Sequence, residues 1–155
     1  RDAIEDYEKK HAMIQEATHL LSVKPDQVDS GIRKLLDANA ALKSKLIAFQ
    51  RQIGEEKAAA IPEGTRKVCF LEPNFQSDEL REMCNKAAVK AELVLGLLPI
   101  REGLCQYVLI SNQTDVREPG KALNEKFNGK GGGQPSMVQG TLMADGEEIK
   151  AYFLE

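Results

Sequence analysis

Apolar side chains recur along the first part of the chain with the spacing of amphipathic helices. The first series alternates steps of three and four residues and consists of Ile4, Tyr7, His11, Ile14, Thr18 and Leu21. Such steps place side chains on one face of a helix. The series stops at "SVKPDQV", where Pro25 suits the first turn of a new helix and Asp26 its positive end. The pattern predicts one helix to about Leu21, a short turn and a second helix.

The second series is longer and keeps a heptad spacing without a break. Its members are Val28, Ile32, Leu35, Asn39, Leu42, Leu46, Phe49 and Ile53. Pro62 and Gly64 of "IPEG" mark the end of this helix. Because a short turn joins the two helices, we expect residues 1–61 to form an antiparallel, coiled-coil-like hairpin.

The polar residue of the second series suggests a further role for this helix. We define the heptad seam as four residues of the series, Leu35, Asn39, Leu42 and Leu46. A seam asparagine is a known device for fixing the pairing of two helices. Two interpretations stay open: the hairpin closes on itself, or the longer helix also forms a homodimer through this seam.

After residue 64 the pattern changes to short apolar runs typical of buried strands. "RKVCFLEP" and "ELVLGLLPI" are two such runs, separated by a polar helix over 77–90 for which Ser77 is the expected N-cap. The turn "REG" leads into a third strand, "LCQYVLIS".

A second helix is expected near 117–127, followed by a glycine-rich loop and a strand at "SMVQGTLMA". "DG" at 145–146 predicts a hairpin turn into a last strand, "EEIKAYFLE". The order is β-α-β-β-α-β-β, which predicts an α/β domain with a mixed sheet over 62–155 and right-handed crossovers.

Composition fits one compact domain with an appendage. The chain has 155 residues, of which 42% are hydrophobic and 29% charged, and its formal net charge is −3. No signal peptide opens it and no apolar run approaches the length of a bilayer span. It begins at Arg1 without a methionine, so we expect a piece of a longer protein. Three unpaired cysteines, Cys69, Cys84 and Cys105, are expected as buried apolar residues of a cytoplasmic protein.

No catalytic or metal-binding set can be assembled from these residues. The only two histidines, His11 and His19, are about two helical turns apart and have no cysteine close in sequence. No serine stands in a nucleophile elbow. We therefore expect no catalytic residues, no metal and no cofactor in this part of the protein.

The stretch "GKGGGQPSMVQG" at 129–140 is the most unusual in the chain. It follows a helix and precedes a strand, whereas Walker and Rossmann loops precede a helix, so nucleotide binding of those kinds is not expected. A glycine-rich turn can instead form a nest of amide groups that accepts an anion. Lys130 lies inside it, with Lys126 and Lys121 upstream. The plainer alternative is a helix stop followed by a wide turn.

"FNGKGGGQPSMVQG" resembles the glycine-rich signature, GGGGG-basic-PDMAQ, of the C-terminal domain of alanyl-tRNA synthetases and long-form alanyl-tRNA editing proteins. "LLSVKPDQVDSGIRKLLDANAALKSKL" is similar to the helical hairpin of the same family, and "RDAIEDY" to the segment before it. The chain departs from the signature at Gln134, where a basic residue is usual, and at Ser136 and Val138. A glutamine still hydrogen-bonds phosphate, ribose or base edges.

The resemblance implies an accessory domain that contacts the outer corner of tRNA(Ala), on a hairpin that can dimerise. The expected RNA-binding residues are Lys121, Lys126, Gly129, Lys130, Gly131, Gly132, Gly133 and Gln134. The short hairpin favours an editing protein, whose zinc-dependent hydrolase domain would lie upstream of Arg1, over a synthetase. Two alternatives are a substrate-binding domain of a DHH-type phosphoesterase and a purely structural dimerisation module.

Overall fold

The computed structural model describes all of residues 1–155 and divides them into two compact units, Arg1–Leu46 and Ile47–Glu155. As predicted, long N-terminal helices are followed by a mixed α/β domain, here with five strands. Helix α2 (Val28–Ala59) runs across the boundary, so its last part belongs with the α/β unit. From the sequence alone, the whole helix is expected to belong to the hairpin over 1–61.

The first unit contains α1 (Asp2–Leu21), a 3-10 turn η1 (Pro25–Gln27) and the start of α2. Ser22 ends α1 in the left-handed conformation, and Leu21 and Val23 pack against Gly31 of α2. Beyond this turn the heptad seam, called the α2 seam from here on, is open, since Leu42 is 64% exposed and no residue of α1 is buried. A single chain therefore leaves the seam uncovered. No helix is both long and apolar enough to cross a bilayer.

The α/β unit is built on one sheet with the strand order β1-β2-β3-β5-β4. The strands are β1 (Thr65–Leu71), β2 (Ala91–Arg101), β3 (Leu104–Ile110), β4 (Lys130–Gln134) and β5 (Met137–Leu142). β1 and β2 pair in parallel, and every other neighbouring pair is antiparallel. β4 is therefore an edge strand with one free side.

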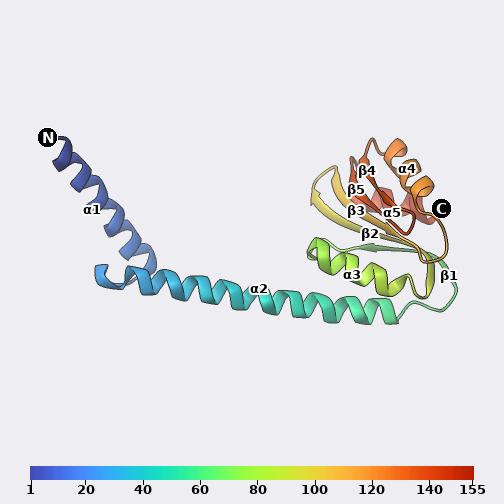
Figure 1. The fold of residues 1–155 in the computed structure, drawn as a ribbon, viewed down its shortest axis with the longest axis horizontal. Helices are drawn as coiled ribbons and strands as arrows, with labels where there is room; N and C mark the ends of the chain where they lie inside the picture. Colours follow the sequence, from blue (N-terminus) through green and yellow to red (C-terminus); the bar gives the residue numbers. More distant parts are fainter. The chain divides into compact units, whose positions relative to one another are not determined.

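Helices cover the two faces of this sheet unequally (Figure 1). α3 (Ser77–Ala87) packs on one face, over β2 and β3, while α4 (Arg117–Lys126) and α5 (Gly146–Leu154) pack on the other. We call these the α3 face and the α4 face. Alternation along each strand supplies both cores. In β3, for example, Val108 belongs to the core under α3 and Leu109 to the core under α4.

Two local predictions are wrong. Residues 146–154 form α5 rather than a last strand, because Ile149 and Phe153 recur at helical spacing and both are buried. Asp145 is the residue before this helix, with φ −76°, whereas the predicted hairpin turn needs positive φ there. Ser77 is not the N-cap of α3: Gln76 holds that position, and the Ser77 hydroxyl donates to Oε1 of Gln106 at 2.8 Å.

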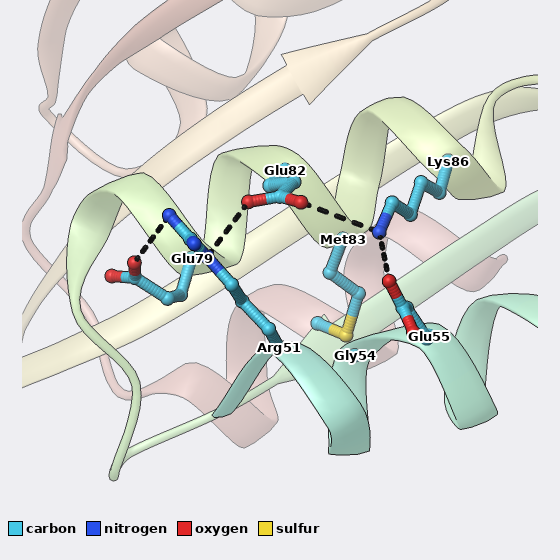
Figure 2. A pocket seen from close by; sticks show the side chains of 7 residues that line it. All are labelled: Arg51, Gly54, Glu55, Glu79, Glu82, Met83 and Lys86. Atoms are coloured by element: carbon cyan, nitrogen blue, oxygen red, sulfur yellow. Dashed lines mark hydrogen bonds and ion pairs between the residues drawn. The ribbon is translucent and has the colours of Figure 1, made fainter. Parts of the chain in front are cut away.

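The last part of α2 packs against α3 within the α/β unit, and Figure 2 shows the contact. Gly54 allows the close approach, since a Cβ there would lie 3.2 Å from the Cβ of Met83. Charged pairs flank this point: Arg51 faces Glu79 and Glu82 on one side, and Lys86 bonds to Glu55 at 2.7 Å on the other. Side chains fill the space between the helices, so this contact is structural.

Candidate nucleic-acid interface

The glycine-rich stretch is a strand, not a loop. Lys130 to Gln134 form β4, which pairs antiparallel with β5 at the edge of the sheet. None of the glycines in the stretch has positive φ; the glycines that do are Gly64 and Gly103. An anion-binding nest needs left-handed residues in alternation, so the predicted nest is wrong. The reversal before the strand is made by Asn128, with φ 48°.

Close internal packing accounts for alternate glycines of the stretch. A Cβ on Gly131 would lie 2.5 Å from the carbonyl oxygen of Gln139 and 2.7 Å from Oη of Tyr107. Gly129 and Gly133 are equally tight against β5. On the same side, the Asn124 amide donates to the Gly131 carbonyl at 3.4 Å. These glycines let β4 lie close to β5 and α4, and no ligand is needed to explain them.

Gly132 is the exception, because a Cβ there would meet nothing within 4 Å. It pairs with Gln139, as Lys130 pairs with Thr141 and Gln134 with Met137. Met137 packs against the core under α3, so these three β4 residues lie on the α3 face. The structure thus brings Lys130, Gly132 and Gln134 together.

The other two lysines predicted to bind RNA lie elsewhere. Lys121 and Lys126 are exposed on α4, on the opposite side of the sheet from Lys130. The Nζ of Lys126 lies 5.5 Å from the centroid of the Tyr152 ring. A single ligand on the α3 face would therefore meet Lys130 without meeting these two lysines.

Several neighbours of β4 on the α3 face could not be identified as candidate site residues from the sequence. No helix covers this face over β4 and β5. We define the open sheet face by the polar side chains that lie on it and on the adjoining part of α3: Ser77, Arg81, Gln106, Lys130, Gln134, Gln139 and Thr141. The available signal was a glutamine at a strand position, Gln106 in "LCQYVLIS" and Gln139 in "SMVQG", where an apolar residue would mark a covered face.

The charge of the open sheet face is low. Lys130 is exposed and makes no salt bridge. Arg81 makes an ion pair with Asp78 one turn earlier on α3. The face therefore offers one free cation and a second that is partly neutralised, among uncharged amides and hydroxyls.

The remaining candidate groups do not cluster. His11 lies on α1 with its ring stacked on Tyr7 at 6.0 Å, and no group of three His, Cys, Asp or Glu side chains is placed to hold a metal ion. Cys84 and Cys105 are buried and Cys69 is half-buried, all as free thiols. Burial raises the pKa of the Cys69 thiol to about 12 and moves the pKa of Cys84 further in the same direction.

Comparison with known proteins finds a similar structure but no matching sequence. No protein-family model matches the chain, and no curated protein sequence matches it. Among solved structures, it is similar to the C-Ala domain of alanyl-tRNA synthetase from Aquifex aeolicus, with a TM-score of 0.46 and 18% sequence identity. The similarity covers 61% of this chain and 91% of that one. This degree of similarity assigns neither family nor function, which have to be inferred from the chain's own residues.

Proposed function

We propose that this chain is a tRNA-binding accessory region of an alanyl-tRNA synthetase-family protein, and that it binds tRNA(Ala) on the open sheet face. One observation carries the proposal. Three residues of the stretch that resembles the family's glycine-rich signature, Lys130, Gly132 and Gln134, lie together on an exposed and uncovered face. A lysine beside bare main chain suits the approach of a sugar–phosphate backbone.

The parent protein is, in this proposal, a cytoplasmic alanyl-tRNA editing protein. It removes serine or glycine from mischarged tRNA(Ala) with a zinc-dependent domain upstream of Arg1. The region described here positions the outer corner of the tRNA and holds no zinc. Contacts of this kind fix orientation rather than sequence, so binding depends on the folded shape of the tRNA.

A titration of the chain with tRNA(Ala) at several salt concentrations tests this function. Lys130→Ala should weaken binding and lower the magnitude of the salt slope by about 1, since one phosphate contact is lost. Lys121→Ala is the matched control, because it removes the same charge from the other side of the sheet. Absence of any affinity for tRNA would refute the function. Equal effects of the two variants would place the contact elsewhere.

A structural dimerisation module is the second candidate, and the open α2 seam favours it. Leu35 and Leu42 are 59% and 64% exposed, which is unusual for leucines on one helical face. The two functions are compatible in one chain. Dimer formation without tRNA affinity would leave dimerisation as the function of this region.

A further inference from the structure

We propose that the open sheet face recognises RNA mainly through hydrogen bonds from glutamine side chains to ribose 2′-hydroxyl groups, and so distinguishes RNA from DNA. This inference rests on the proposed tRNA binding and goes beyond it. It predicts a ligand chemistry, a weak salt dependence and a role for two residues outside β4, Gln106 and Gln139.

The strand register places these groups in neighbouring rows. Gln106 of β3 pairs with Thr141 of β5, which pairs in turn with Lys130 of β4. In the next row, Gln139 lies beside Gly132. Paired residues of antiparallel strands project from the same face with Cβ atoms about 5 Å apart. The row that contains Gln106 therefore continues directly to Lys130.

The N-terminal part of α3 borders these rows. Its Ser77 hydroxyl donates to Oε1 of Gln106, so the amide hydrogens of Gln106 remain available. Arg81, Gln106 and Gln139 line one shallow hollow together. Beside it, Gly132 has no side chain and open space above it, which leaves room for a sugar ring close to the main chain.

The polar groups on this face match a ribose better than a phosphate. A carboxamide both donates and accepts hydrogen bonds, as does a 2′-hydroxyl, whereas phosphate oxygens only accept. With Lys130 free and Arg81 paired to Asp78, one or two phosphates at most would be neutralised. The logarithm of the affinity should then fall against the logarithm of salt concentration with a slope of about −1 to −2, far less than in charge-driven RNA binding.

The test compares a tRNA(Ala) transcript with its all-deoxy counterpart, using the chain as it stands. The unsubstituted chain should bind the RNA more tightly than the DNA. Gln139→Ala should weaken RNA binding about five-fold, leave DNA binding unchanged and leave the salt slope unchanged, because it removes hydrogen bonds and no charge. Gln106→Ala should act in the same way. Gln52→Ala, on an exposed part of α2, is the matched control.

The comparison separates the possible causes of an RNA preference. If shape alone caused it, Gln139→Ala would weaken RNA and DNA binding equally, and the inference would be wrong. It would also be wrong if the glutamine variants bound like the parent while Lys121→Ala or Lys126→Ala bound weakly. If the unsubstituted chain bound no tRNA, the proposed function itself would be wrong. Circular dichroism of each variant is the control for folding. Replacing an exposed residue such as Gln139 should leave the spectrum unchanged.

Discussion

Lys126 and Lys130 are close in sequence, yet they project from opposite sides of the sheet. Lys126 ends α4, where its ammonium group lies over the Tyr152 ring, and Lys130 begins β4 with its partner Thr141 on the α3 face. The chain reverses between them at Asn128, in the left-handed conformation. A basic cluster in the sequence is thus divided in the fold, and the two lysines make separable contributions to any charge-dependent binding.

Adjacent glycines of β4 should respond differently to the addition of one methyl group. Gly131→Ala should lower the free energy of unfolding by about 1–3 kcal/mol, because the new Cβ would meet the Gln139 carbonyl and Tyr107. Gly132→Ala should change it by no more than about 0.5 kcal/mol, since the space there is empty. Urea denaturation of both variants measures the difference. Equal stabilities would mean that β4 does not lie against β5 as described.

Gln50 should be important for the docking of α2 on α3. Its side chain is 3% exposed, donates to the Asn74 carbonyl at 2.5 Å and accepts from the Gln76 amide at 3.3 Å. Gln50→Leu leaves both backbone groups without this partner and should cost about 1–3 kcal/mol in urea denaturation. Gln52→Leu is the control: its side chain is exposed, so the loss should stay within about 0.5 kcal/mol. Similar losses in the two variants would contradict the docking role.

We expect the α2 seam to pair with the same seam of a second chain, which would bury its exposed leucines. Asn39→Leu should then stabilise the dimer and broaden its distribution of oligomeric states, because the asparagine fixes register at a cost in stability. Ser44→Leu adds the same side chain on another face of the helix and should do neither. Light scattering over a range of concentrations reports the outcome. Strictly monomeric parent and variant proteins would exclude a dimer through this seam.

The buried thiols predict a loss of stability in alkali. The ordinary thiol pKa is 9.0, and burial raises the pKa of Cys69 to about 12 and also raises that of Cys84. Above the ordinary value the unfolded chain releases protons that the folded chain keeps, so the free energy of unfolding falls as pH rises through this window. The fall approaches about 1.4 kcal/mol per pH unit for each thiol.

Urea denaturation from about pH 8 to about pH 10 tests this prediction. The double variant Cys69→Ala/Cys84→Ala should show a shallower fall than the parent, because it has lost two groups that bind protons only in the folded state. A parallel pH dependence in the two proteins would show that other groups cause the loss.

Elements with a strong hydrophobic period could be predicted from sequence. α1, the start and end of α2, and the strands β1, β2, β3 and β5 lie where apolar spacing placed them. The fifth predicted strand lies in the wrong segment. "DG" predicts a hairpin turn there, whereas Ile149 and Phe153 recur at helical spacing and Asp145 suits the start of a helix.

The position of β4 could not be predicted, because nothing in "KGGGQ" favours a strand locally. Glycine has low strand propensity, and here the extended conformation is imposed by β5 and α4. For the same reason, the sequence indicates Lys130, Gly132 and Gln134 as candidate site residues but not their neighbours Gln106 and Gln139. Pairing between strands distant in sequence decides which side chains share a face.

The composition of β4 also bears on the solubility of the protein. An exposed sheet edge offers unpaired amide and carbonyl groups on which the strand of another molecule can add, which is how many proteins begin to aggregate. β4 is short, begins with a lysine and holds three glycines, the residue that pairs least persistently in strands. The same glycines that fit this strand against its neighbour therefore make its free edge a poor template for fibre growth.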